Sequence, residues 1–180
     1  MRRVIVSNMM SLDGMLDGPQ RELDWHGVDE EFFGYAREML RSVDAILFGR
    51  TTYAMMAAYW PAAPRDEIAD KMNGLPKIVF SKSLAAAEWA NTTLVRGDSA
   101  AEVARLKQQP GKDLAILGSG ALASSLLQAG LIDEYRALVN PVVLGGGTPL
   151  FQNIRERIRL RLNGVRQFGS GVVMLTYQPL

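Results

Sequence analysis

The spacing of apolar residues alternates between two periods over the first two-thirds of the chain. Short runs rich in β-branched and apolar residues, at 3–11 and 45–49, predict buried strands. Between them, residues 29–43 carry apolar side chains at helical spacing, behind Asp29 and Glu30, two acids that suit the start of a helix. This part of the chain therefore predicts a strand, a long loop, a helix and a second strand.

The alternation continues toward residue 130 and then stops. Strand patterns alone follow it, and alternation of this kind predicts a parallel sheet with helices on both faces. The closing pair of strands predicts a hairpin with an antiparallel strand at the sheet edge. One α/β domain over residues 1–180 is expected. Its further helices are expected at 50–60, 63–74, 98–111 and 121–130, and its further strands at 76–81, 92–97, 113–117, 134–147, 157–168 and 171–178.

Composition narrows the class of protein. Of the 180 residues, 48% are apolar, which allows a sizeable core without covalent staples. The absence of cysteine excludes a disulfide framework, a thiolate metal site and a cysteine nucleophile. The single histidine, His26, has no metal-binding spacing with nearby carboxylates, so no metal is expected. No apolar run approaches the roughly 20 residues that span a bilayer. The N-terminus has the pattern of a strand and not of a signal peptide, so no membrane partner and a cytoplasmic location are expected.

Charge is balanced along most of the sequence. The formal net charge is +1, and basic and acidic residues are interspersed except in "RERIRLRL" at 155–162. In a strand, the spacing of this stretch places its four arginines on one face, which predicts a solvated sheet face that could border a dimer. The stretch lacks the breadth and the interleaved aromatic residues of a nucleic-acid site, so no nucleic-acid partner is expected. The four residues are Arg155, Arg157, Arg159 and Arg161.

Three of the expected strands end in residues that suit an anion. "FGRTTY" at 48–53 places Arg50 and two threonines at a helix start, where backbone N–H groups are unpaired and the helix dipole is positive. "FSKS" at 80–83 offers a serine and a lysine, and "GSGA" at 118–121 offers a serine between two glycines at another helix start. Each motif has an ordinary alternative, because Thr51 could only cap its helix and the other two could only be turns.

The three junctions are more informative together than singly. The carboxyl ends of parallel strands share one edge of the sheet, and a dinucleotide with an extra ribose phosphate brings three phosphates to such an edge. The usual glycine fingerprint for dinucleotides is incomplete, because its sixth position is Ala123 and no acid follows at the expected distance. Arg50 and Lys82 in place of that acid favour NADP over NAD.

A second glycine run, "LGGGTPLF" at 144–151, follows a strand pattern but precedes no helix pattern. Without a helix start it is a poor site for a phosphate. Two interpretations stay open for it: a loop that lets the chain pass close to a ligand, or a flexible bend.

Four segments, at 7–18, 44–60, 77–84 and 114–151, carry a resemblance to a known family. In this order they resemble the dihydrofolate reductase fold family. They are more similar still to the reductase domain of the bifunctional riboflavin-biosynthesis deaminase-reductase and to its small single-domain relatives. The resemblance covers nearly the whole chain. It implies a dihydrofolate reductase-like three-layer sandwich with a mostly parallel central sheet, NADPH bound across the strand ends, and a homodimer.

The resemblance also implies which residues would contact the cofactor, and all three junctions contribute. It favours a phosphate cradle over a plain turn at the GSGA motif. The expected contacts are Met9 and Leu16 at the nicotinamide; Gly49, Arg50, Thr51 and Thr52 at the phosphates; Ser81 and Lys82 at the 2′-phosphate and adenine; and Gly118, Ser119, Gly120, Ala121 and Leu122 at the pyrophosphate.

The implied chemistry is hydride transfer from the cofactor to a C=N or C=O bond, with the protein orienting the reactants. In dihydrofolate reductases a carboxylate at the start of the first helix binds the pterin. Asp29 falls at that position and is the expected catalytic and substrate-binding residue, with Phe33 one turn further on and Glu30 as an alternate. Asp29 could instead be only an N-cap. Trp25 could wall the substrate pocket or pack within its loop.

Two classes of function follow. The first is an NADPH-dependent reductase of a pyrimidine- or pterin-like heterocycle, similar to the 5-amino-6-(5-phosphoribosylamino)uracil reductase of riboflavin biosynthesis. The alternatives are a non-enzymatic nucleotide-binding module on the same fold and a dihydrofolate reductase. The sequence shows no clear extra basic cluster for a ribose phosphate, so the substrate stays open.

Overall fold

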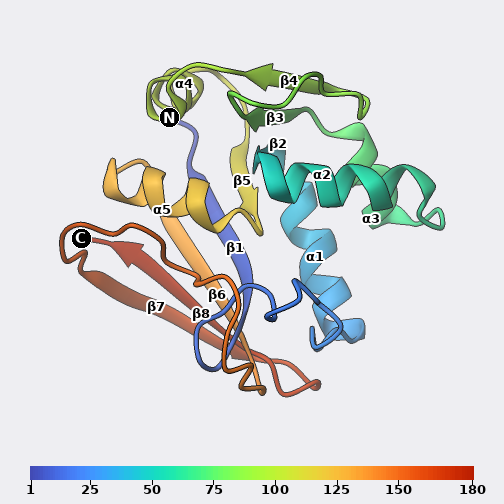
Figure 1. Cartoon of the computed structure of the whole chain (residues 1–180), viewed down its shortest axis with the longest axis vertical. Helices are drawn as coiled ribbons and strands as arrows, with labels where there is room; N and C mark the ends of the chain where they lie inside the picture. Colours follow the sequence, from blue (N-terminus) through green and yellow to red (C-terminus); the bar gives the residue numbers. More distant parts are fainter.

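The computed structural model describes residues 1–180, and eight strands form one sheet in the order β4-β3-β2-β5-β1-β6-β8-β7 (Figure 1). Strands β1 to β6 are mutually parallel, and β8 runs antiparallel to both of its neighbours. The strands are β1 Val4–Ser11, β2 Val43–Gly49, β3 Lys77–Phe80, β4 Thr92–Val95, β5 Asp113–Leu117, β6 Glu134–Asn140, β7 Leu160–Gln167 and β8 Val173–Pro179. The helices are α1 Glu30–Ser42, α2 Arg50–Tyr59, α3 Glu67–Gly74, α4 Ser99–Lys107 and α5 Gly120–Gln128, with a 3-10 turn at Trp60–Ala62. The expected α/β class is confirmed.

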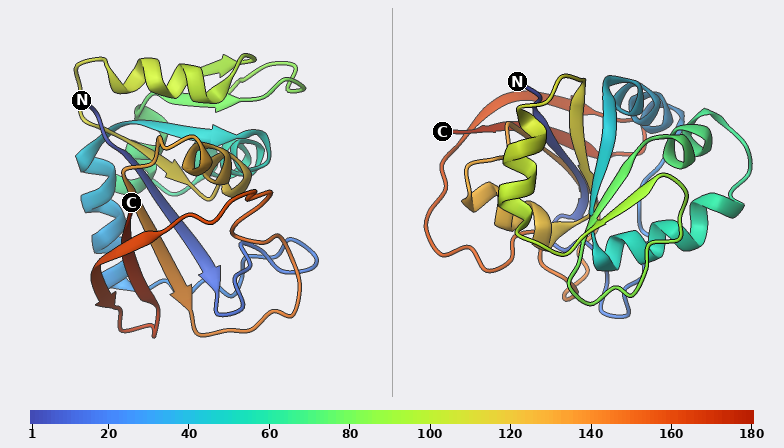
Figure 2. Two further views of the ribbon diagram at one scale, coloured as in Figure 1. Left: turned by 90° about the vertical axis from the view of Figure 1, so that its left-hand side faces the viewer. Right: turned by 90° about the horizontal axis from the view of Figure 1, so that it is seen from above.

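Helices cover both faces of the sheet, which gives the expected three layers (Figure 2). α4 and α5 pack on one face, and α1, α2 and α3 pack on the other. Successive residues of β1 alternate between the two cores, because Val4 and Val6 face α5 whereas Ile5 faces α1. Burial on both faces explains why the central strands have continuous apolar runs in the sequence.

After the neighbouring strands β2 and β5, the chain continues toward opposite edges of the sheet. From β2 it continues through α2 to β3 on one side, and from β5 it continues through α5 to β6 on the other side. The two helices therefore start next to each other at the strand ends but lie on opposite faces of the sheet. In open α/β sheets, ligands bind in the crevice at such a reversal, outside the carboxyl ends of the strands.

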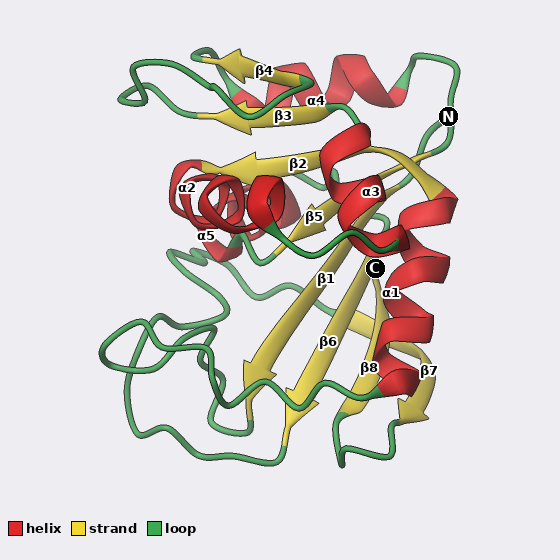
Figure 3. Cartoon of the chain, turned by 90° about the vertical axis from the view of Figure 1, so that its right-hand side faces the viewer, coloured by secondary structure: helices red, strands yellow, loops and turns green.

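Strand β1 is longer than its neighbour β5. The pairing of β1 with β5 ends at Ser7 and Leu117, whereas its pairing with β6 continues to Ser11 and Asn140. The last residues of β1 therefore have a strand partner on one side only. Figure 3 shows β1 and β6 continuing past the end of β5, so that the sheet forks next to the reversal point.

The C-terminal strand β8 lies between β6 and β7, so the antiparallel strand is one place in from the edge and β7 forms the edge itself. The expectation of a strand that carries all four arginines of residues 155–162 is wrong. Arg155, Arg157 and Arg159 lie outside the strand, which begins at Leu160. Because β7 is parallel to β6, residues 141–159 must return along the length of the sheet before β7 can start. The alternating arginines mark part of this return segment and not a continuous strand.

Candidate functional site

Helices α2 and α5 begin without a side-chain cap. Gly49 has no side chain to offer, and the hydroxyl of Ser119 makes no cap hydrogen bond to its own helix. The first N–H groups of a helix have no intrahelical partner, and the helix dipole adds positive charge there. Two open helix starts at the reversal point are therefore suited to negatively charged groups.

The two open helix starts are tied together by direct hydrogen bonds. The Gly49 amide donates to Ser119 Oγ at 3.0 Å, and Thr52 Oγ1 donates to the Gly118 carbonyl at 3.3 Å. The buried Asn8 accepts from the Gly118 amide at 2.8 Å, which links this turn to β1. These hydrogen bonds join two of the three expected junctions and fix their relative position.

The glycines of the GSGA turn have a reason in the protein's own backbone and packing. Gly118 has a φ of +69°, in the left-handed region that favours glycine. At Gly120, an added Cβ would collide with the side chain of Leu16. The open N–H groups, and not the glycines, are therefore the features that suit a phosphate. The exposed Ala121 lies on this first turn, whereas the Leu122 side chain is buried in the core, so only its backbone is available to a ligand.

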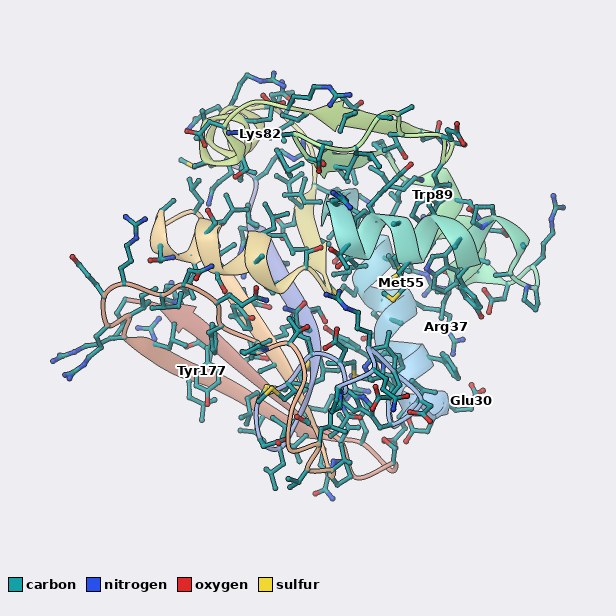
Figure 4. The ribbon with its side chains drawn as sticks, viewed as in Figure 1. Glu30, Arg37, Met55, Lys82, Trp89 and Tyr177 are labelled. Atoms are coloured by element: carbon teal, nitrogen blue, oxygen red, sulfur yellow. The ribbon has the colours of Figure 1, made fainter.

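A group of three cations lies beyond the α2 start. Arg50 donates to Ser83 Oγ at 2.7 Å, and Arg96, at the end of β4, donates to the carbonyl of Lys82 at 3.3 Å. Lys82 is exposed at the top of the view in Figure 4. None of the three cations forms an ion pair. The Ser81 hydroxyl accepts the amides of Ser83 and Leu84, so it stabilises the turn.

Two loops pack together over the fork in the sheet. Leu16 donates its amide to the Thr148 carbonyl at 2.8 Å, and the Asp17 carboxylate accepts the Thr148 amide at 2.8 Å. Asp13 accepts the amides of Leu144 and Gly145, and its hydrogen bonds, that from Ser11 first, lower its pKa to about 2. The glycine run at 144–151 therefore passes close to the protein's own loop. Neither sequence interpretation included this packing.

Asp29 caps helix α1. Its Oδ1 accepts the Phe32 amide at 2.8 Å, and its Oδ2 accepts the Ser170 amide in the β7–β8 turn at 2.6 Å. The hydrogen bond from Phe32, ahead of the other contributions, lowers the pKa of this carboxyl group. A carboxylate with both oxygens bound and a lowered pKa is a poor proton donor. The structure supports the capping interpretation, and a catalytic role for Asp29 stays a prediction.

The remaining expected substrate residues have structural contacts as well. Trp25 donates to the Glu22 carbonyl at 3.0 Å and contacts His26 edge-on, so it packs within its loop. Phe33 packs against the core between α1, α2 and α3. Met9 lies half-buried near the free end of β1, where Asn140 Nδ2 approaches its sulfur at 3.6 Å.

Family comparison is consistent with this arrangement. The family model of the RibD C-terminal domain matches residues 2–174. The chain belongs to this family. The protein YyaP of Bacillus subtilis, described as uncharacterized, is 36% identical over 182 residues, covering 98% of this chain and 94% of YyaP. YwjB of the same organism, also described as uncharacterized, is 32% identical over 176 residues, covering 95% of each protein.

Solved structures show the same dihydrofolate reductase-like fold. A riboflavin biosynthesis protein from Shewanella sp. PV-4 superposes with a TM-score of 0.79 at 23% identity, covering 99% of both chains. RibD of Acinetobacter baumannii superposes with a TM-score of 0.71 at 20% identity, covering 100% of this chain and 58% of RibD. The chain thus spans little more than half of that longer protein, and the matched part of RibD has the same fold.

Sequence reasoning missed three residues that organise this RibD-type domain. Asn8 and Asn140 are 1% and 0% exposed, and each holds a loop to the strand ends. Their signal was a polar residue inside a buried strand, which requires hydrogen-bond partners. Arg96 gave no such signal, because only the pairing of β3 with β4 brings it to Lys82.

Three further observations concern a hollow, metal binding and membrane crossing. A hollow of about 360 Å³ between α2 and residues 86–89 shares only Tyr53 with the three junctions and includes none of the expected cofactor contacts. No group of three or more histidine and acidic side chains is arranged to hold a metal ion. None of the helices combines the length and the apolar character needed to cross a membrane.

Proposed function

We propose that this protein is an NADPH-dependent reductase that transfers a hydride to a C=N or C=O bond of a pyrimidine- or pterin-like heterocycle. The observation that carries the proposal is the pair of open helix starts, joined through Gly49 and Ser119, at the reversal point of the sheet. Membership of the RibD C-terminal domain family supports a reductase like that of riboflavin biosynthesis.

In this proposal the chain binds and orients, and NADPH supplies the hydride when bound. The first-turn amides of α2 and α5, including those of Thr51 and Ala121, hold the pyrophosphate. Leu16 and the end of β1 at Met9 flank the nicotinamide. The heterocycle then lies on the β1 side of the fork, next to the start of α1.

The three unpaired cations support NADPH over NADH. Arg50, Lys82 and Arg96 surround the turn after β3, and the added phosphate on the ribose is the group that needs such charges. Arg50 and Arg96 both donate to residues of this turn, so they are held close to one another. A single substitution in this group is expected to reduce the preference between the two cofactors.

The first test is a fluorescence titration with NADPH and with NADH. We expect micromolar binding of NADPH, binding of NADH about tenfold weaker, and loss of this preference in Arg50→Ala. Arg105→Ala is the matched control, because Arg105 pairs with Glu102 on α4 and takes no part in the site. If neither cofactor binds, the proposed function is wrong.

A second candidate is a nucleotide-binding module without catalysis. It is favoured by Asp29, whose two oxygens are both bound and whose pKa is lowered. The two candidates separate when NADPH-loaded protein is mixed with oxidised pterins and pyrimidines. Consumption of NADPH that depends on the heterocycle supports the reductase, and cofactor binding without consumption by any of them supports the module.

We also propose a homodimer that uses the apolar face of the β7–β8 hairpin. Leu162 and Val165 are 50% and 61% exposed, and their strand partners are Tyr177 and Leu175 on the same face. Tyr177 marks this face in Figure 4. Light scattering is expected to show a dimer for the natural protein and a monomer for Leu162→Asp, and a monomeric natural protein would contradict the proposal.

A further inference from the structure

Proteins bind a phosphate group mainly through open helix starts and through free cations. The two halves of the strand-end edge differ in both. The cofactor half, at β2, β3, β4 and β5, has two open helix starts and three unpaired cations. The substrate half consists of the ends of β1 and β6, the loop 12–29, the start of α1 and the turn 168–172. Its one helix start is capped by a carboxylate, and two of its arginines have a partner within the protein.

Carboxylates occupy and surround the helix start of the substrate half, which is the start of α1. Asp29 occupies the N-cap of α1, and Glu30 and Glu31 lie in the first turn. The Glu31 carboxylate accepts the Gly169 amide at 2.9 Å, which holds it beside the same turn that Asp29 binds. Three carboxylates thus surround the one helix start that could otherwise bind an anion.

Two of the three arginines of the substrate half have a partner within the protein. Arg37 lies 3.7 Å from Glu30, and Figure 4 shows these two side chains on the same helix. The Arg166 guanidinium lies over the ring of Phe168, 4.8 Å from its centroid. Arg21 forms no ion pair, but it lies in an exposed turn, where solvent and salt screen its charge. Burial lowers the pKa of His26, and its Nε2 is buried without a partner, so the imidazole adds no positive charge at neutral pH.

We infer that the heterocycle accepted by this site carries no phosphate or carboxylate group and is neutral or cationic. The inference rests on the proposed function, since it concerns the acceptor of the same reductase site. A phosphorylated acceptor would bring a dianion to a helix start that is closed by three carboxylates. The Glu30 side chain, which is 90% exposed, can accept a hydrogen bond from an exocyclic amino group, a common feature of pterins and aminopyrimidines.

The experiment compares matched acceptors on the NADPH-loaded protein. One pair is a ribosylated diaminopyrimidine with and without its terminal phosphate, and the other is hydroxymethylpterin with and without a phosphate on that group. Affinity is read from the change in NADPH fluorescence, and turnover from the loss of NADPH absorbance. We expect the unphosphorylated member of at least one pair to bind about tenfold more tightly than its phosphorylated partner.

A charge reversal sharpens the test. Glu30→Lys removes one carboxylate, adds a cation and releases Arg37, so it is expected to reduce the preference against phosphate about tenfold. Glu38→Lys is the control, because Glu38 is exposed on the same helix, two turns further from its start. It is expected to change the preference less than about twofold, because solvent and salt screen charges at that distance.

The outcomes separate this inference from the proposed function. If NADPH does not bind, the proposed function is wrong and the inference falls with it. If NADPH binds and the phosphorylated members bind equally well or better, only the inference is overturned. Binding of neither member of either pair also overturns it, because the class of acceptor is then wrong.

Discussion

Helices α2 and α5 begin without a side-chain cap, whereas α1, α3 and α4 each begin with an aspartate. The carboxylates of Asp29, Asp66 and Asp98 accept the amides of Phe32, Ala69 and Ala100. A cap of this kind stabilises a helix by about 1 kcal/mol, so the two uncapped starts give up stability. They are also the two starts that meet at the reversal point of the sheet. In the proposed function, the phosphates of the cofactor take the place of the missing carboxylates.

Ser119 illustrates how an open start is maintained. Serine is among the preferred N-cap residues, yet this hydroxyl accepts the Gly49 amide of the neighbouring helix start and makes no bond to its own helix. The same side chain therefore holds the two junctions together and leaves the amides of Ala121 and Leu122 in α5 without a partner. A capping side chain elsewhere in the molecule satisfies its own helix, and here it organises a site.

The largest expected effect comes from adding carboxylates to the open starts. Thr51→Asp combined with Ala121→Asp should weaken NADPH binding about 100-fold, or about 2.7 kcal/mol, because both side chains are exposed on the first turns that hold the pyrophosphate in the proposed function. The melting temperature should not fall, since acids are favourable at helix starts. The control pair is Thr51→Asn with Ala121→Asn, which adds similar volume without charge. Equal effects of the two pairs on binding would argue against open anion sites.

Removal of one cation from the cofactor half should have a smaller effect. Arg96→Ala is expected to weaken NADPH binding about tenfold, or about 1.4 kcal/mol, and to leave NADH binding unchanged. The reason is that Arg96 donates to the carbonyls of Lys82 and Ala85 in the turn after β3 and makes no hydrogen bond to the first turns of α2 and α5. Titration with both cofactors checks this. An equal loss for both would place Arg96 at the pyrophosphate or in a structural role.

Much of the difference between capped and uncapped helix starts could be predicted from the sequence, because its signals are local. An aspartate before an amphipathic stretch predicts a cap, and Asp29 and Asp98 are caps in the structure. A strand that runs into Gly-Arg-Thr or Gly-Ser-Gly predicts a junction at the strand ends, and Gly49 and Ser119 meet there.

The rest depended on contacts between segments far apart in the chain. Arg96 is brought to Lys82 by strand pairing, and Asn140 joins the loop at Gly27 to β1 across more than 100 residues. The wrong strand start at 157 has a related cause, since alternation in the return segment imitates a strand. A local pattern cannot distinguish a strand from an extended chain that lies outside the sheet.

Removal of a carboxylate from a capped start should affect stability and not binding. Asp66→Ala and Asp98→Ala are each expected to lower the free energy of unfolding by about 1 kcal/mol, because the amides of Ala69 and Ala100 lose their acceptor. The affinity for NADPH should stay the same, since neither helix start contributes to the site. Urea unfolding and a cofactor titration on the same samples check both statements. Asp66→Asn and Asp98→Asn keep a capping oxygen and should recover most of the stability.

The smallest expected effect is the pH dependence of the α1 cap. The lowered pKa of Asp29 in the folded protein means that its carboxylate stabilises the fold above the ordinary value of 3.8, and that this contribution is lost as the pH falls through the lower folded value. Asp29→Asn keeps an oxygen that can accept the Phe32 amide but cannot titrate. The difference in free energy of unfolding between the natural protein and this variant should therefore be constant above pH 3.8 and shrink below it. Urea midpoints measured on both sides of that pH decide the matter. Two parallel curves would show that the charge of Asp29 contributes nothing to the cap, and the contrast with the uncapped helices would then rest on hydrogen bonds alone.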